Sequence, residues 1–116
     1  MTLLEIKEAL DAECLTCEES LQDDVFAGIS SDLMSDVLAF AKEKVVLLTG
    51  LVNTQVIRAA ETMGIKAVVF VRGKSPTPDM IALARSKGLV LMNTGHPLYV
   101  AAGLLYSNGL GGLTVE

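Results

Sequence analysis

Short apolar runs alternate with longer stretches of helical periodicity along this chain. Residues 45–48 are all apolar, a run too short for a helix, and Thr49 and Gly50 follow them as a turn. The next apolar side chains fall on one helical stripe up to Gly64, a glycine placed where helices often end. Residues 65–71, apolar except for Lys66, are predicted to form the second strand. We therefore predict a strand–helix–strand unit with parallel strands and a right-handed crossover.

Short apolar runs and stretches of helical periodicity predict the remaining strands and helices in the same way. Helices are expected at residues 2–10, 33–44, 54–64, 78–87 and 98–107, and further strands at residues 13–17, 25–30 and 89–92. Thr2 and Glu5 have the spacing of a capping box, and Thr77 is placed to cap the fourth helix. Ser31 or Asp32 is expected to accept hydrogen bonds from the free N–H groups at the start of the second helix.

Alternation of strands and helices indicates an α/β protein. We predict a three-layer α/β/α sandwich with a largely parallel sheet of about five strands. The 116 residues contain no interdomain linker, so a single domain is expected at residues 1–109. Residues 110–116 are apolar and glycine-rich without periodicity, and we expect a flexible C-terminal tail there. Gly28 lies inside a predicted strand, which indicates a bulge or the close approach of another backbone.

Composition narrows the range of partners. Hydrophobic residues make up 51% of the chain and aromatic residues only 4%, so the core must be aliphatic. The net charge is −5 and no basic stripe occurs, which argues against nucleic acid and anionic membrane surfaces as partners. No apolar run approaches the roughly 20 residues of a membrane span, and the N-terminus has no signal-peptide pattern. We therefore expect a cytoplasmic location.

Cys14 and Cys17 form a C-x-x-C pattern beside a predicted strand and among acidic residues. Acidic neighbours raise the pKa of a thiol, and a zinc site would need two more ligands in a chain with two Cys and one His. We interpret the pair as small, partly buried side chains. Asp32 and Asp36 have the spacing of one helix face, where such a pair binds a metal or, more often, faces solvent. No metal or other cofactor is expected.

Polar and glycine residues gather after the predicted strands. Because the carboxyl ends of parallel strands meet at one edge, where helix N-termini also point, these loops are expected to form a ligand-binding edge. Asn53 or Thr54 is also expected to cap the helix that follows it. Arg72 and Lys74, at the end of the next strand, are expected either to bind a phosphate or to be simply solvated. The candidate ligand-binding residues are Ser31, Asp32, Gly50, Asn53, Thr54, Arg72, Gly73, Lys74, Thr94 and His96. They contain no catalytic triad and no metal cage, a composition typical of a binding site.

Several segments together resemble the DRTGG domain, a small α/β module found in phosphotransacetylase-like proteins and in CBS-domain pyrophosphatases. The resemblance rests on residues 31–37, 54–64, 70–76 and 101–106. At the positions of the motif that names the family, this chain has Val52-Asn53-Thr54 for Asp-Arg-Thr and Arg72-Gly73 for Gly-Gly. The resemblance implies a fold similar to the N-terminal domains of HPr kinase/phosphorylase and of Mur ligases, pairing with a second copy, and a link to adenine nucleotides. It does not imply kinase activity, because the chain has no G-x-x-x-x-G-K-[ST] loop.

The expected function is that of a non-enzymatic regulatory or ligand-sensing module. Its expected ligand is a phosphate-bearing small molecule such as an adenine nucleotide, and its expected assembly is a homodimer. One alternative is a protein–protein interaction or assembly module without a small-molecule ligand. A second alternative is a small enzyme that uses His96, the sole histidine, although no nucleophile can be paired with it from the sequence.

Overall fold

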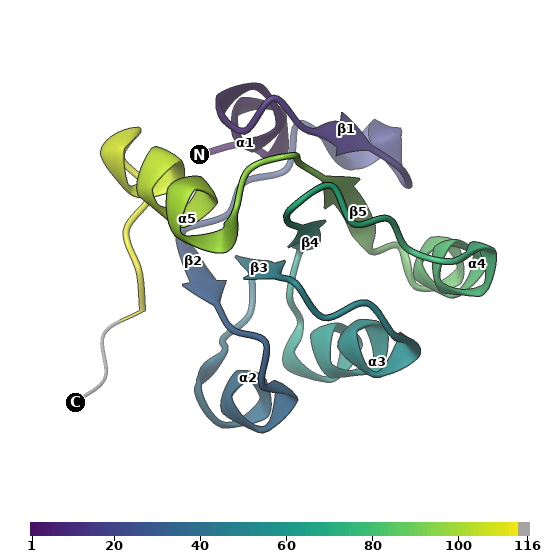
Figure 1. Ribbon diagram of the computed structural model, residues 1–116. Helices are drawn as coiled ribbons and strands as arrows, with labels where there is room; N and C mark the ends of the chain where they lie inside the picture. The colour runs from purple at the N-terminus through teal and green to yellow at the C-terminus, as the bar shows by residue number, and fades with distance from the viewer. Residues whose placement is uncertain (114–116) are drawn as a thin grey trace.

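The computed structural model describes residues 1–113, which form a five-stranded sheet between two layers of helices (Figure 1). The helices are α1 (Leu3–Ala9), α2 (Met34–Phe40), α3 (Thr54–Met63), α4 (Pro78–Lys87) and α5 (Leu98–Ser107), with a short 3-10 turn, η1 (Glu18–Ser20). The strands are β1 (Glu13–Cys14), β2 (Ala27–Ser30), β3 (Val45–Thr49), β4 (Ala67–Phe70) and β5 (Val90–Asn93). The α/β fold class predicted from the sequence is therefore confirmed.

The order of the strands explains the layers. The sheet runs β1-β5-β4-β3-β2, with β2 to β5 parallel and β1 antiparallel to β5. Because β2, β3, β4 and β5 follow one another in one direction across the sheet, right-handed crossovers place α2, α3 and α4 on the same face. Figure 1 shows α1 and α5 on the opposite face. The described sheet thus lacks the reversal of strand order at which doubly wound folds open a ligand crevice.

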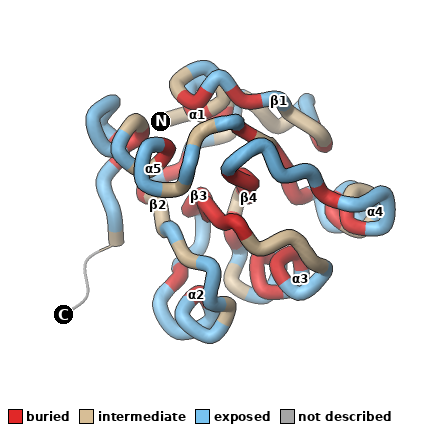
Figure 2. Tube along the Cα trace, viewed as in Figure 1, coloured by how far each residue is buried: buried red, intermediate tan, exposed pale blue. Residues whose placement is uncertain are grey.

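Side chains of the central strands alternate between two aliphatic cores. Val46 and Leu48 of β3 pack with α1 and α5, whereas Val45 and Leu47 pack with α2, α3 and α4. All five residues of β3 are buried, and Figure 2 shows the buried class concentrated along the middle strands. A strand buried on both faces needs apolar residues at every position, which is why residues 45–48 read as a continuous apolar run.

Most helix ends follow the local signals in the sequence. The Thr2 hydroxyl accepts a 3.1 Å hydrogen bond from the Glu5 N–H, and the Glu5 carboxylate accepts one of 2.9 Å from the Thr2 N–H. These bonds to Thr2 lower the pKa of the Glu5 carboxyl below its ordinary value. Thr77 caps α4 through a 3.3 Å bond from Met80 N–H, and Gly64 ends α3 in the left-handed region, at φ 69°.

Helix α2 differs from its prediction in length and in cap. It ends at Phe40 instead of residue 44, because Ala41 is extended at ψ 153° and turns the chain toward β3. Its N-cap is Leu33, which makes no side-chain capping bond, so the expectation that Ser31 or Asp32 caps this helix is wrong. Strand β1 is also shorter than predicted and ends at Cys14, because the Leu91 N–H of β5 bonds to the Thr16 hydroxyl instead of to a backbone carbonyl of this segment.

The segment after α5 lies along the open edge of β2. Leu110 is buried, the Gly28 N–H donates a 3.0 Å hydrogen bond to the Gly111 carbonyl, and Gly28 pairs with Gly112 in a parallel bridge. The close backbone approach indicated by Gly28 is confirmed by this hydrogen bond and bridge, whereas an added Cβ would meet the Leu110 side chain only at an ordinary contact distance of 3.5 Å. Residues 114–116 of the expected tail lie outside the described residues, and the domain boundary after residue 109 stays a prediction.

Among residues 1–113, no helix is long and apolar enough to cross a membrane.

Candidate ligand-binding site

Three loops at the carboxyl ends of the parallel strands meet around Gly50. Asp32, in the loop after β2, accepts a 2.6 Å hydrogen bond from the Gly50 N–H and one of 3.1 Å from the Thr49 hydroxyl. Lys74, in the loop after β4, donates a 2.8 Å hydrogen bond from Nζ to the Gly50 carbonyl. Both backbone polar groups of this buried glycine are therefore satisfied by side chains from other loops.

The loop after β4 is a tight turn with unusual backbone geometry. Arg72 and Gly73 have φ values of 57° and 70°, and the Lys74 N–H donates a 3.2 Å bond to the Val71 carbonyl. Positive φ at both central residues is the pattern of a type I′ turn, and it is strained for an arginine. The turn brings the Arg72 guanidinium over Gly50, where an added Cβ would lie 3.3 Å from its Nη2 atom.

The loop after β5 holds this turn in place. The Arg72 N–H donates to the His96 carbonyl and the Gly73 N–H to the Thr94 carbonyl, both at 2.8 Å. Thr94 is buried, and its hydroxyl donates a 2.7 Å bond to the Leu10 carbonyl, so this hydroxyl faces the interior. The His96 ring is half-buried and has no hydrogen-bond partner among the described residues. Among residues 1–113, no nucleophile is therefore hydrogen-bonded to the ring of this histidine.

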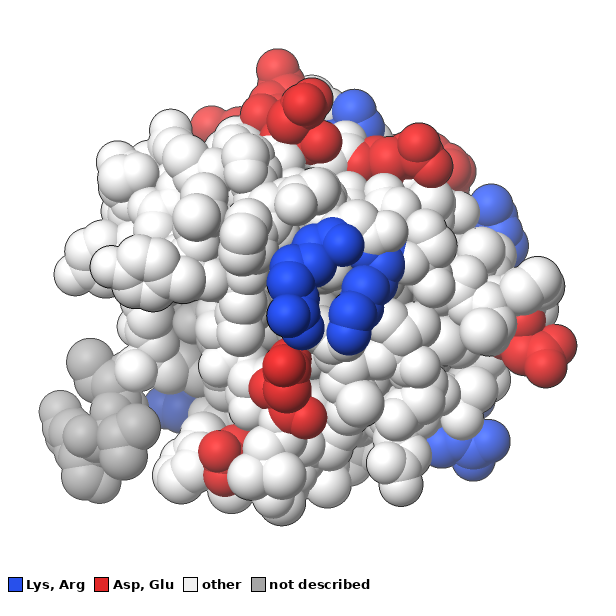
Figure 3. Space-filling model, viewed as in Figure 1, with Lys and Arg blue, Asp and Glu red and all other residues white. Residues whose placement is uncertain are grey.

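Charge is concentrated where these loops meet. Figure 3 shows two basic side chains lying next to each other beside an acidic one in the centre of the visible face. The ion pairs among residues 1–113 are Lys66–Asp23 and Lys87–Glu61, so neither Arg72 nor Lys74 forms one. The Asp32 carboxylate nevertheless lies beside Arg72, since an added Cβ on Gly50 would be 3.4 Å from its oxygens and 3.3 Å from the Arg72 Nη2 atom. Lys74 uses one of its three donors on Gly50, which leaves two for a ligand.

The remaining expected site residues have local roles. Asn53 caps α3, its side-chain oxygen accepting a 3.3 Å bond from Val56 N–H, and Thr54 is exposed at the first position of that helix. The Ser31 hydroxyl accepts a 3.0 Å bond from the N–H of residue 33 in a local turn. Asn53 and Thr54 thus lie at the start of α3, whereas Arg72 and Lys74 lie in a different loop, the one after β4.

A cleft of about 590 Å³ opens beside Gly50, between α2 and α3. Its size falls within the roughly 300 to 1,000 Å³ of small-molecule sites. Its walls are mainly apolar, with a few polar side chains. The lining residues are Asp32, Leu33, Met34, Ser35, Leu38, Leu51, Gln55, Arg58, Ala59 and Thr62. Leu33 and Leu38 are 57% and 48% exposed, an unusual degree for leucine side chains in one groove.

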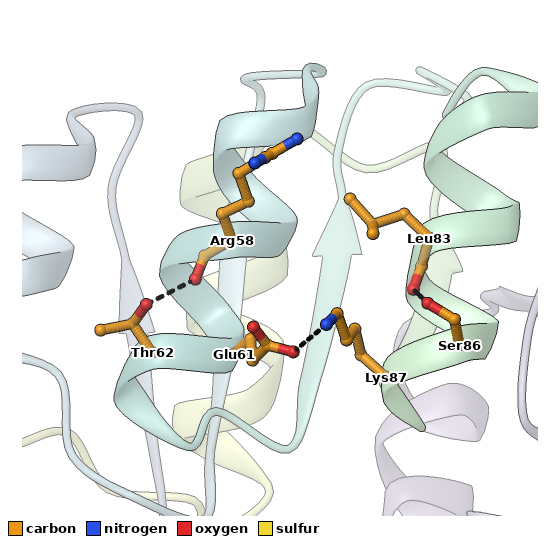
Figure 4. A network of polar contacts seen from close by, with 6 residues as sticks. All are labelled: Arg58, Glu61, Thr62, Leu83, Ser86 and Lys87. Atoms are coloured by element: carbon orange, nitrogen blue, oxygen red, sulfur yellow. Dashed lines mark hydrogen bonds and ion pairs between the residues drawn. The ribbon is translucent and has the colours of Figure 1, made fainter.

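Most of this cleft was missed by sequence reasoning, which included only Asp32 of its lining. Gln55, Arg58 and Thr62 are polar residues at helical spacing on one face of α3, a pattern that resembles an ordinary solvated helix face. In Figure 4, Arg58 contributes its carbonyl to the network between α3 and α4, accepting a 2.9 Å bond from the Thr62 hydroxyl. The Arg58 guanidinium takes no part in that network, so it is available to a ligand.

The two acidic residues near α2 do not form the pair that their spacing suggested. Asp32 lies before the helix and faces Gly50, whereas Asp36 lies in the first turn of α2 and lines a separate hollow with Phe40. The expectation that they share one helix face is wrong, because the helix begins only at Met34. Among residues 1–113, no three His, Cys, Asp or Glu side chains are grouped closely enough to hold a metal ion.

The C-x-x-C pattern surrounds a buried threonine. Cys14 is half-buried, its Sγ donates a 3.2 Å bond to the Thr16 carbonyl, and Cys17 is buried; the two do not form a disulfide. Burial raises the pKa of the Cys14 thiol, and the charge of Glu18 contributes in the same direction. A thiol that holds its proton is a weak nucleophile and a weak metal ligand, so this environment favours a packing role.

Comparison with known proteins gives a match at the level of fold. No family model matches the sequence, and no curated protein matches it. The fold is similar to the solved structure of the CBS and DRTGG domains of the regulatory region of Clostridium perfringens pyrophosphatase, complexed with the activator diadenosine tetraphosphate. The TM-score is 0.72 at 17% sequence identity.

The similarity covers 90% of this chain and 45% of the pyrophosphatase chain, so this chain spans less than half of that protein's solved length. It supports the DRTGG-like fold indicated by the sequence. The expected similarity to the N-terminal domains of HPr kinase/phosphorylase and of Mur ligases is not tested by this match and stays a prediction.

Proposed function

We propose that this domain is a non-enzymatic regulatory module that binds a phosphate-bearing small molecule, such as an adenine nucleotide, beside Gly50. The observation that carries the proposal is the position of Arg72 and Lys74. Both cations lie at Gly50, and neither is paired with a carboxylate among the described residues. Two adjacent cations of this kind suit a phosphate, whose oxygens accept charge-assisted hydrogen bonds.

The start of α3 adds to this site. The Asn53 side chain accepts from one N–H of the first turn, and no hydrogen bond involves the N–H groups of Thr54 and Gln55 among the described residues. Free N–H groups and the helix dipole favour an anion at such a position. The negative Asp32 carboxylate opposes an anion at Gly50, because its two hydrogen bonds come from neutral donors and leave its charge in place. The two cations would have to outweigh this single negative charge for a phosphate to bind.

The fold comparison supports a regulatory role. The similar domains belong to a regulatory region, and that region was solved with a nucleotide activator. An enzymatic role for His96 has less support, because no described side chain forms a hydrogen bond with its ring. We also retain the cytoplasmic location as part of the proposal.

Isothermal titration calorimetry with ATP, ADP and AMP at fixed salt tests the proposal. Losing one charged hydrogen bond costs about 1.5–3 kcal/mol, so Arg72→Ala and Lys74→Ala should each weaken binding by roughly ten- to a hundredfold. Lys42→Ala is the matched control, because Lys42 is an exposed cation that lines none of the hollows around Gly50. Absence of binding at millimolar nucleotide, or equal losses in all three variants, would contradict the proposal.

A second candidate function, protein–protein assembly, is favoured by the outer face of α5. Tyr99 and Tyr106 are 88% and 72% exposed, and Val100 is 42% exposed. Aromatic side chains are enriched in the centres of interfaces, and a symmetric homodimer would bury this face on both copies. Light scattering at tens of micromolar protein should then give the mass of a dimer, and Tyr99→Ser with Tyr106→Ser should give the monomer. A monomer mass for the wild type would reject this candidate.

A further inference from the structure

We infer that the cleft between α2 and α3 holds a planar heterocycle, a nucleobase, whose attached phosphates reach Arg72 and Lys74. This inference rests on the proposed function and deepens it, because it assigns the two parts of one ligand to two adjoining parts of the surface. Neither the sequence motifs nor the fold comparison point to this cleft.

The cleft adjoins the position of Arg72 and Lys74 through Asp32 and Gly50, although neither cation lines the cleft. Asp32 lines the cleft and bonds to the Gly50 N–H, and Leu51, the next residue in the chain, is part of the cleft wall. Lys74 bonds to the carbonyl of the same glycine. A molecule in the cleft therefore needs to extend past Gly50 and the Asp32 carboxylate beside it to place a phosphate next to both cations.

The lining suits a flat, hydrogen-bonding ring. Leu33, Leu38 and Leu51 provide apolar surface, and the two exposed leucines of this set would be covered by a bound ring. Gln55 carries both a donor and an acceptor, which is what the edge of a nucleobase requires. The Arg58 guanidinium is planar and can stack on an aromatic ring or bind a phosphate.

Other occupants fit this lining less well. A bare inorganic phosphate would leave the exposed leucines uncovered, and a purely apolar chain would make no use of the polar groups of Gln55 and Arg58. A ligand that combines an aromatic ring with a phosphate uses all of these groups together.

Calorimetry with matched ligands separates the two parts of the site. ATP carries the base and the phosphates, tripolyphosphate carries the phosphates alone, and adenosine carries the base alone. With the full chain at fixed salt, ATP should bind at least about tenfold more tightly than tripolyphosphate. Arg72→Ala should weaken both of these ligands, because both would use the cation.

Two variants test the cleft itself. Leu38→Ser removes apolar wall at a half-exposed position, and Ala59→Leu fills the floor. Each should weaken ATP by roughly five- to tenfold and leave tripolyphosphate unchanged. Val100→Ser is the matched control, since it changes an exposed apolar residue on α5, away from the cleft. Thermal unfolding of each variant shows whether it folds. If Ala59→Leu does not fold, Leu38→Ser still tests the cleft, because Leu38 is exposed.

The outcomes are distinct. Selective loss of ATP binding in the cleft variants supports the inference. Equal affinity for ATP and tripolyphosphate, with no effect of Leu38→Ser, overturns the inference and leaves the phosphate site in place. Absence of binding for both ATP and tripolyphosphate overturns the proposed function and the inference together.

Discussion

The Asp32 carboxylate accepts a 2.6 Å hydrogen bond from the backbone N–H of Gly50, a residue 18 positions later in the chain. This bond joins the loop after β2 to the loop after β3, and it fixes the glycine over which Arg72 lies. The same carboxylate lines the α2–α3 cleft. A single side chain thus links the strand-end loops to the cleft. Removing it tests how much this link contributes to the stability of the protein.

Asp32→Ala should reduce the free energy of unfolding by about 1–2 kcal/mol, because the N–H of buried Gly50 loses its partner. Asp32→Asn retains an acceptor oxygen and should cost less. Asp36→Ala is the control, since Asp36 is exposed and carries no comparable hydrogen bond to another loop. Urea unfolding measures all three variants. A loss in Asp32→Ala no larger than that in Asp36→Ala would show that the bond to Gly50 contributes nothing to stability.

Arg72 should be a position where glycine is more stable than alanine. Its φ of 57° is strained for any residue with a Cβ. The free energy of unfolding of Arg72→Gly should therefore be about 1 kcal/mol larger than that of Arg72→Ala. Lys74 lies next to this turn without a positive φ, so there Lys74→Gly should be no more stable than Lys74→Ala. Thermal or urea unfolding of the four variants decides the point. The same preference for alanine at both positions would argue against a strained arginine.

Thr16 should matter for stability far more than its neighbours in the C-x-x-C pattern. It is buried, and its hydroxyl donates a 2.7 Å bond to the Leu89 carbonyl and accepts a 2.8 Å bond from the Leu91 N–H. Thr16→Val preserves the shape but leaves two buried backbone groups unpaired, at a cost of about 2–4 kcal/mol. Thr16→Ser keeps both bonds and should cost about 1 kcal/mol for the lost methyl group. Similar unfolding free energies for the two variants would refute this account.

The Cys14 thiol should ionise only at unusually high pH. Burial raises its pKa above the ordinary 9.0, so the unfolded chain loses this proton before the folded chain does. The stability from this group is therefore complete below the ordinary pKa and is lost as pH rises through the folded pKa. In the Cys17→Ser variant, the rate of Cys14 alkylation should have its midpoint above pH 9.0.

The stability of the wild type should also fall more steeply between neutral and alkaline pH than that of Cys14→Ala. The difference between the two proteins isolates this thiol from the lysines and tyrosines that ionise in the same range. An alkylation midpoint near neutral pH would identify a reactive thiol and reopen the question of redox chemistry at this pattern.

Local signals in the sequence predicted a large part of the fold. Helix α5 occupies the residues that its periodicity indicated, and Thr2, Thr77 and Gly64 have the capping roles that their positions suggested. These features depend on interactions within four or five residues, so they can be recognised from the sequence. The parallel order of β3 and β4 could be predicted as well, because a crossover helix leaves few alternatives.

Only the tertiary structure decided how the candidate site is arranged. From the sequence, Asp32 could accept a hydrogen bond from its own helix or from another loop. The Gly50 N–H, in the loop after β3, determines which. Arg72 takes its left-handed conformation because the loop after β5 accepts hydrogen bonds from its turn. The α2–α3 cleft exists because successive right-handed crossovers place the two helices side by side. Such contacts join residues far apart in the sequence, where neither periodicity nor local propensity carries a signal.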